Sequence, residues 1–354
     1  MTDKIRALGL NLLLTVVVVL FCFVLLEIAA RVASNLLGVA PYIKYNPQLG
    51  WSPKANSTKL HKKNGDFAAT YTINSLGYRG KLHGQNHTPG VFRIVLLGDS
   101  VGFGWGVDDQ QTYGARLETI LPEVEVINLA VSGYGTDQEL LRLKSEGINF
   151  QPDLVILHVV DNDFLEIRRP FMYQRAKPYF LQGDDNKLEL NNVPVKSYGS
   201  LARYYYDSSL PLPFREWLAW NSYAYTFFNK RYREFMARAQ KATGITTTAI
   251  REGETTPKNQ AWQLFKNLVE EINFELRKKN IKGLIIHASA NLNSSAKMAE
   301  LPLPTLNLYP LLYELHTKKE VSFPNDGHWN PFGHKLVAEK LAEELIRLEL
   351  TSNK

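Results

Sequence analysis

Four short segments of this chain carry residues that together could catalyse acyl transfer. Ser100 follows a mostly apolar run, and Asp326 and His328 stand just before a C-terminal stretch with a helical pattern. A serine hydroxyl is a weak nucleophile until a neighbouring base takes its proton, and an imidazole oriented by a carboxylate is a common base. Between them, the Gly133 backbone N–H and the Asn162 side-chain amide could hold an oxyanion, with the Ser100 N–H as third donor. We therefore predict serine acyl chemistry.

These segments resemble the sequence blocks of the SGNH/GDSL hydrolase family, which is named for Ser, Gly, Asn and His. The blocks lie, in chain order, at residues 94–104, 128–135, 159–163 and 325–330. The resemblance covers residues 71–348, apart from a large insertion, and it implies catalytic Ser100, His328 and Asp326. Asp161 stands where the family usually has glycine. The Asp-to-His spacing of two, where the family often has three, is similar to related membrane-associated acetyl-transfer branches.

Several residues near the blocks allow other interpretations. His334 is the alternative base, although its position in the family has no catalytic role. Asp161 could repel an oxyanion, so we expect its side chain to point away from the site. We expect Asp99 and Asp163 to make structural hydrogen bonds. Three glycines of the serine block are expected to leave room near the acyl group: Gly102, Gly104 and Gly106.

The N-terminal region contains a long apolar segment. Residues 7–26 carry no charge, and as a helix they span about 30 Å, the thickness of a bilayer's hydrocarbon core. The segment is longer than the apolar part of a secretory signal. We favour an uncleaved anchor over a signal cleaved near residues 32–34 or a buried core helix. Lys4 and Arg6 place the N-terminus in the cytoplasm, so we expect a single-pass inner-membrane protein with a periplasmic or extracellular catalytic domain.

Composition and motifs argue against several other classes of protein. The 354 residues are 45% hydrophobic and 21% charged, which is ordinary for a globular domain with one apolar segment. The net charge is +6, but the basic residues are scattered without the stripe that nucleic-acid binding needs. The single cysteine, Cys22, excludes an intrachain disulfide. No metal-binding or dinucleotide motif is present, so we expect no metal and no cofactor.

Apolar runs and helical patterns alternate after the anchor. We expect strands at residues 92–97, 125–129, 154–159 and 282–287, and a short last strand at 320–323. Helices are expected at residues 111–121, 137–146 with Thr136 as N-cap, 257–276 after Thr256, 308–316, and 331–348 with Asn330 as N-cap. Strands that are apolar on both faces are typical of a parallel sheet covered by helices. The pattern predicts an α/β fold, a flavodoxin-like three-layer α/β/α sandwich.

The chain is expected to divide into three parts. Residues 1–34 form the membrane anchor, 35–90 a tether and N-terminal extension, and 91–350 the hydrolase-like domain. Residues 165–256 are dense in aromatic side chains, are expected to be mostly helical over 213–238, and read as an inserted subdomain. Its aromatic residues could form a small core, contact the substrate as a lid, or rest on a membrane.

We therefore expect a membrane-anchored serine esterase. Its substrate would be an acyl group, most simply acetyl, on a cell-envelope glycan or lipid. The same residues would serve an O-acetyltransferase, which would need a partner such as the envelope polysaccharide machinery to deliver acyl groups. A non-catalytic glycan-binding or assembly scaffold with this fold is the third alternative. No interaction with nucleic acid is expected.

Overall fold

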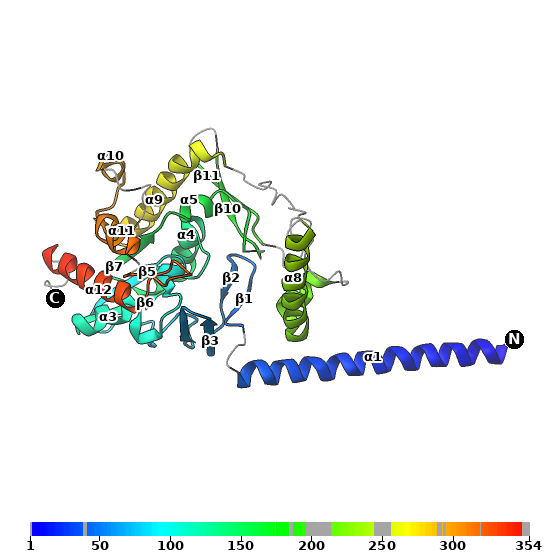
Figure 1. Ribbon diagram of the computed structural model, residues 1–354. Coiled ribbons are helices and arrows are strands. Elements are labelled where there is room, and N and C mark those ends of the chain that lie inside the picture. The colour runs from blue at the N-terminus through cyan, green and yellow to red at the C-terminus, as the bar shows by residue number, and fades with distance from the viewer. Residues whose placement is uncertain are drawn as a thin grey trace. The chain divides into compact units, whose positions relative to one another are not determined.

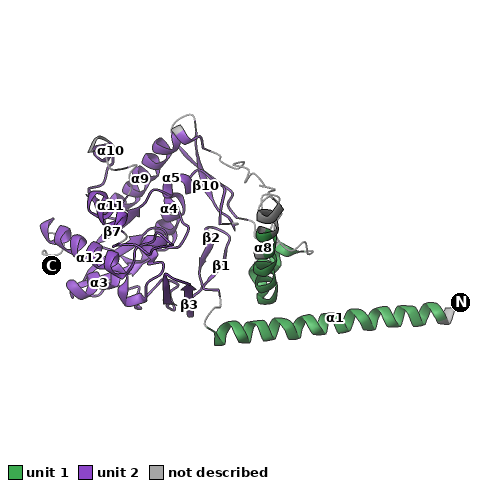
Figure 2. Cartoon of the chain, in the orientation of Figure 1, with its two compact units in different colours: residues 1–40, 198–249 green, residues 41–197, 250–354 purple. Residues whose placement is uncertain are grey.

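The computed structural model describes residues 2–37, 41–173, 175–183, 187–195, 214–243, 256–288, 292, 295–318 and 320–348. The chain divides into two compact units, which Figure 2 shows in green and purple. Unit 1 comprises residues 1–40 and 198–249, and unit 2 comprises residues 41–197 and 250–354. The sequence segments of the predicted active site all belong to unit 2.

A parallel sheet of five strands forms the centre of unit 2 (Figure 1). Its strands are β5 (Phe92–Leu97), β6 (Val124–Asn128), β7 (Leu154–Val159), β12 (Lys282–His287) and β13 (Thr305–Asn307). They pair in the order β13-β12-β7-β5-β6, and every pair is parallel. Numbered along the chain, this is the flavodoxin-like order 2-1-3-4-5, which reverses direction between β5 and β7. The predicted fold class is confirmed.

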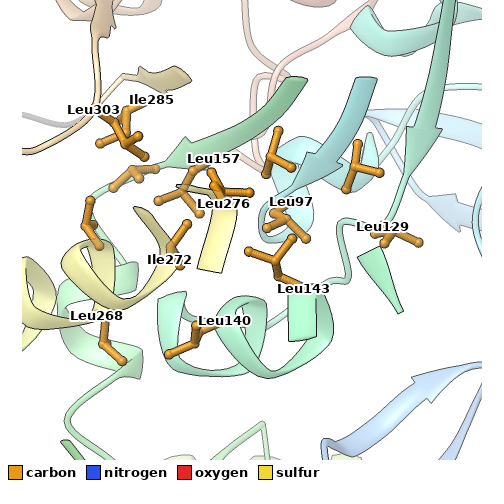
Figure 3. Close-up of a cluster of buried hydrophobic side chains, with 14 of the residues drawn as sticks. Leu97, Leu129, Leu140, Leu143, Leu157, Leu268, Ile272, Leu276, Ile285 and Leu303 are labelled. Carbon is orange, nitrogen blue, oxygen red and sulfur yellow. The ribbon is translucent and has the colours of Figure 1, made fainter. Parts of the chain in front are cut away.

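Helices cover both faces of the sheet. The larger ones are α3 (Tyr113–Ile120), α4 (Thr136–Ser145), α9 (Ala261–Lys278), α11 (Tyr309–Thr317) and α12 (Pro331–Arg347). Successive residues of β5 face opposite sides: Leu97 belongs to a buried cluster with residues of α4 and α9, and Leu96 to one with residues of α3 and α12. Figure 3 shows the first cluster, which joins Leu140 of α4 and Ile272 of α9 to Leu97 of β5. This two-sided burial explains why the strands have no polar alternation.

The expected boundaries hold for most core elements. Three predicted strands match the observed bounds and a fourth, β6, is shifted by one residue. Asn330 caps α12 by accepting hydrogen bonds from Phe332 N and Gly333 N. Two cap predictions were wrong. Gly135, not Thr136, is the N-cap of α4. Residues after Thr256 first form a 3-10 turn, Lys258–Gln260, so α9 begins only at Ala261.

The predicted strand at 320–323 is also wrong. Its only strand-like pairing is an isolated bridge between Ser322 and Trp329, and the fifth strand of the sheet is β13. The chain reverses at Gly327, and Phe323 N donates a 3.0 Å hydrogen bond to His328 O. Local backbone bonds therefore replace the sheet pairing, and they fix the loop that carries His328.

Two hairpins precede the sheet in unit 2. The first joins β1 (Ile43–Asn46) to β2 (Gly50–Pro53), and the second joins β3 (Ser57–Lys63) to β4 (Phe67–Ile73). Their inward residues Trp51 and Tyr71 are fully buried. Residues 41–73, expected to be a tether and extension, thus pack within the catalytic unit.

The remaining elements of unit 2 are short. They are the helices α2 (Ser100–Phe103), α5 (Asp163–Glu166) and α10 (Ser295–Ala299), the 3-10 turns Asp109–Gln111 and Gly147–Phe150, and the strands β8 (Phe171–Met172), β9 (Arg175–Ala176), β10 (Tyr179–Gln182) and β11 (Leu188–Asn191). The β8–β11 segment is the first part of the aromatic-rich insertion, and it belongs to unit 2.

Unit 1 consists of α1 (Thr2–Leu36), α7 (Arg215–Asn221) and α8 (Tyr223–Thr243). The second part of the insertion therefore groups with the N-terminal helix. Three aromatic residues of the insertion, Tyr204, Tyr205 and Tyr206, lie outside the described residues. One helix among the described residues, Lys4–Leu36, is long and apolar enough to cross a membrane, and its apolar window is not buried. A signal sequence has the same properties, so this finding alone establishes an apolar N-terminal helix.

Candidate active site

Ser100 begins helix α2 directly after strand β5. Asp99 is the N-cap of this helix, and its Oδ1 accepts a 2.8 Å hydrogen bond from Val101 N. The carboxyl end of β5 lies at the point where the strand order reverses, which is where ligands bind in such sheets. The local sequence therefore holds the Ser100 hydroxyl at the usual binding edge of the fold, where it is half-buried.

The structure brings Ser100, His328 and Asp326 together. Ser100 Oγ lies 2.8 Å from His328 Nε2, and His328 Nδ1 is hydrogen-bonded to Asp326 Oδ1. Gly327 adopts a left-handed backbone conformation with φ of +84°, so the side chains on either side of it turn towards each other. With the Nδ1 proton donated to the carboxylate, Nε2 is the acceptor for the serine proton. Trp105 stacks on the His328 ring at 5.6 Å between centroids.

Lys63 is a residue of the site that the sequence prediction missed. Its Nζ donates hydrogen bonds to Asp326 Oδ2 at 2.7 Å and to Asn325 O at 2.8 Å. Burial opposes ionisation of Asp326, but the hydrogen bonds from Lys63 and His328 hold its pKa below the ordinary value. Lys63 lies more than two hundred residues away in sequence, on a hairpin with no motif, so no sequence signal pointed to it.

Two backbone N–H groups are available as oxyanion donors. Within the part of the chain that the structure describes, neither Ser100 N nor Gly133 N donates a hydrogen bond. Gly133 has a φ of +83°, and a Cβ at this position would come within 2.6 Å of the Tyr173 ring. Both the backbone conformation and the overlying ring therefore require glycine here.

The Asn162 side chain lies beside the serine. Its Nδ2 donates hydrogen bonds to Asp99 Oδ2 at 3.1 Å and to Glu166 Oε1 at 3.0 Å. Ser100 Oγ also lies 3.2 Å from Asp99 Oδ2, so the amide and the hydroxyl share one carboxylate oxygen. The neighbouring Asp161 is exposed, in line with the expectation that it points away.

Buried carboxyl groups lie behind this site. Asp99, Glu139, Asp163 and Glu166 are each no more than 1% exposed. Burial, followed by the nearby Asp99 charge, raises the pKa of Glu166 to about 8. Burial likewise raises the pKa of Asp163 and of Glu139 well above their ordinary values. Asp163 Oδ2 accepts a 2.8 Å hydrogen bond from Val160 N, which is the structural contact expected for it.

Within the part of the chain that the structure describes, His334, the alternative base, makes no hydrogen bond to the Ser100 hydroxyl. Its ring is buried, stacks on Tyr113, and accepts a 3.3 Å hydrogen bond at Nδ1 from Tyr113 N. Burial holds its pKa well below the ordinary value, so it stays neutral. His334 is therefore a core residue of helix α12.

The glycines after Ser100 serve packing instead of leaving room for an acyl group. A Cβ at Gly104 would come within 2.5 Å of Thr112, and one at Gly106 within 2.5 Å of Phe323. A Cβ at Gly102 would meet Ala130 at 3.0 Å. The expectation was wrong because the α2 turn is packed against its neighbours on these sides.

Within the described residues, no group of three His, Cys, Asp or Glu side chains could hold a metal ion.

A comparison with protein families places this chain. The model of the GDSL-like lipase/acylhydrolase family matches residues 96–277, about half of the chain. The chain belongs to this family. It is therefore a serine hydrolase of carboxylic esters, as the sequence predicted. No curated protein matches the sequence.

Several solved structures resemble part of this chain, each at low sequence identity and a low TM-score. A lipolytic G-D-S-L protein from Veillonella parvula is 14% identical, with a TM-score of 0.39, over 73% of this chain and all of that one. The esterase EstA from Pseudoalteromonas sp. is 10% identical, with a TM-score of 0.38, over 72% and 97% of the two chains. A two-domain esterase active on acetylated mannans is 13% identical, with a TM-score of 0.37, over 74% of this chain. This chain covers half of that esterase's length.

Proposed function

We propose that this GDSL hydrolase is a membrane-anchored esterase that uses Ser100, His328 and Asp326 as a catalytic triad. The observation that carries the proposal is a chain of two hydrogen bonds. One joins Ser100 Oγ to His328 Nε2 at 2.8 Å, and the other joins His328 Nδ1 to Asp326. A non-catalytic scaffold would have no need of this alignment, so the geometry favours the enzyme.

In the first step, His328 Nε2 takes the Ser100 proton as Oγ attacks the ester carbonyl carbon. The negative charge that develops on the carbonyl oxygen is met by the N–H groups of Ser100 and Gly133. His328 then gives its proton to the leaving alcohol, and the C–O bond of the ester breaks. The product of this step is an acyl group on Ser100.

In the second step, His328 takes a proton from water as the water oxygen attacks the acyl carbon. The Ser100–acyl bond breaks, Oγ recovers the proton from His328, and the carboxylic acid leaves. A sugar hydroxyl in place of water would transfer the acyl group instead. The same residues serve both outcomes, so the acceptor decides between hydrolase and O-acetyltransferase.

Asn162 is the proposed third oxyanion donor. Its amide group already donates to Asp99 and Glu166. One of its N–H groups can donate to the oxyanion as well as to the carboxyl oxygen when negative charge develops. A full negative charge on the acceptor strengthens the hydrogen bond to it. The two carboxyl groups thereby fix the direction of the amide before the substrate arrives.

The proposed substrate is an ester of a small acyl group, such as acetyl, on a large envelope glycan or lipid. The site is open at the surface: Ser100 and Asn162 are half-buried, and the His328 side chain is 27% exposed. A bulky acyl donor can therefore present its ester without entering a deep cavity. The α1 helix, with Lys4 and Arg6 on its cytoplasmic side, would hold the enzyme on the outer face of the inner membrane.

Hydrolysis of p-nitrophenyl acetate by the full chain in detergent tests the triad. The wild type is expected to release nitrophenol, and Ser100→Ala is expected to lose this activity while keeping the same thermal unfolding. Equal rates in the two proteins would contradict the proposal. Adding acetylated xylan or acetylated envelope glycan, with and without a sugar acceptor, then separates release of acetate from transfer.

A further inference from the structure

Helix α8 begins where the apolar part of α1 ends. Glu27 is the first charged residue after the uncharged run of residues 7–26. Its Oε2 accepts hydrogen bonds from Ser222 Oγ at 2.7 Å and from Ala224 N at 3.1 Å, and its Oε1 accepts one from Tyr223 N at 3.0 Å. A side chain of α1 thus caps the first turn of α8.

Arg31 strengthens the same junction one turn later. Its Nε bonds Glu27 Oε1 at 2.7 Å, its Nη2 donates to Asn221 O at the end of α7, and its guanidinium lies 4.8 Å from the Tyr223 ring centre. The carboxylate therefore satisfies the N–H groups that start α8, and the guanidinium satisfies the carbonyl that ends α7. This bonding fixes the level along α1 at which α8 starts.

The exposed side of α8 is aromatic and basic. Phe227, Phe228 and Phe235 are 57%, 46% and 65% exposed. Arg231 lies over the Phe227 ring at 5.6 Å, and Lys230 and Arg238 are also exposed. Helices with exposed aromatic and basic residues of this kind lie in the interface of a bilayer, where the rings enter the headgroup boundary and the cations meet lipid phosphates.

We propose that α8 lies flat in the headgroup region of the membrane that α1 crosses, and that it binds anionic phospholipid. The inference rests on the proposed membrane anchor. If α1 spans about 30 Å of hydrocarbon with residues 7–26, Glu27 stands at its boundary. Figure 2 shows α8 running crosswise to α1 within unit 1, which directs it along the membrane plane. The level at which α8 starts, its direction and its exposed side chains therefore all fit a helix that lies in the headgroup region.

Lipid-quenching of a site-specific fluorophore tests this proposal on the full chain. The only cysteine is replaced by Cys22→Ser, and a polarity-sensitive dye is attached at Phe235→Cys on α8 or at Val17→Cys in the middle of α1. The proteins are reconstituted into phosphatidylcholine vesicles with or without phosphatidylglycerol. Spin-labelled lipids carry the quencher on the headgroup or deep in the acyl chain.

We expect the headgroup quencher to remove most of the fluorescence at position 235, more strongly with phosphatidylglycerol. The deep quencher should act mainly at position 17. Quenching at position 17 without quenching at 235 would overturn the interfacial helix and leave the anchor intact. Loss of quenching at both positions would overturn the anchor and this inference with it.

The Glu27 junction has its own control. Glu27→Ala in the Phe235→Cys protein removes the cap on α8 and should reduce headgroup quenching at position 235. The same change in the Val17→Cys protein should leave the deep quenching unaltered. Unchanged quenching at position 235 would show that Glu27 does not set the level of α8.

Discussion

Lys63 Nζ donates a 2.7 Å hydrogen bond to Asp326 Oδ2, while the other carboxylate oxygen of Asp326 contacts His328. The ion that orients the proposed base is therefore itself held by a cation from the β3–β4 hairpin. The hairpin also holds the loop by a second bond, since Asp66 Oδ1 accepts a 2.8 Å hydrogen bond from Asn325 N. The N-terminal extension thus contributes to the geometry of the proposed triad.

Replacing Lys63 should change the pH dependence of the enzyme more than its maximal rate. The hydrogen bonds to Asp326 lower its pKa, so Lys63→Met should raise that pKa and move the loss of activity caused by protonating Asp326 to higher pH. At neutral pH we expect a loss of less than about tenfold, because solvent screens the Lys63 side chain, which is 38% exposed.

Lys62→Met is the matched control, since Lys62 is the exposed neighbour on the same strand. Lys63→Arg should retain most of the wild-type profile. If Lys62→Met and Lys63→Met give the same acidic limb as the wild type, the contact with Asp326 has no part in the reaction.

Replacing Ser100 or His328 alone should remove most of the activity, and replacing both should cost little more. Ser100→Ala and His328→Ala should each lower kcat by about 10³-fold or more, and the double variant should be little worse than either.

His334→Asn should retain the active site, and any loss of activity should come from a lower thermal midpoint, because His334 is a buried core residue. Steady-state kinetics and thermal unfolding on the same samples check this. A strongly impaired kcat with unchanged stability in His334→Asn would argue for His334 as the base.

Asn162 should contribute to the transition state more than to substrate binding. Asn162→Ala removes the proposed side-chain donor and is expected to lower kcat by about 10²–10³-fold with a small change in KM. Asp161→Ala, at the exposed neighbouring position, should leave both constants nearly unchanged. The idea fails if the Asp161 variant loses as much activity as the Asn162 variant.

Glu166 should make the folded state less stable as pH rises. Burial raises its folded-state pKa to about 8 from the ordinary 4.5, so between these values the folded chain keeps a proton that the unfolded chain has released. Stability should therefore fall with rising pH across this window, by up to roughly 1.4 kcal/mol for each pH unit.

Glu166→Gln removes this titration while keeping the side-chain shape. Its free energy of unfolding, measured with urea from about pH 5 to about pH 8, should decline less with pH than that of the wild type. Identical slopes in the two proteins would show that Glu166 is ionised in the folded state throughout. The variant also keeps an oxygen that can accept from Asn162, which separates the effect on stability from an effect on the amide.

The sequence by itself determined the fold class and named the candidate catalytic residues. Two-sided apolar runs such as residues 92–97 and 154–159 specify buried parallel strands, because only a sheet covered on both faces buries them fully. Ser100 and Asn162 each follow an expected strand, at residues 92–97 and 154–159, and Asp326 and His328 are close in the chain. Local patterns therefore sufficed to name these residues.

Only the tertiary structure decided which distant groups surround them. Lys63 reaches Asp326, and Glu166 and Asp99 hold Asn162, through contacts that depend on how loops and hairpins pack. The segment 320–323 became a loop because bonds to the residues around His328 outcompeted sheet pairing. Glu27 likewise binds α8 across nearly two hundred residues of chain. Such contacts have no period or motif in the sequence, since they arise only when separate elements are brought together by the burial of their apolar faces.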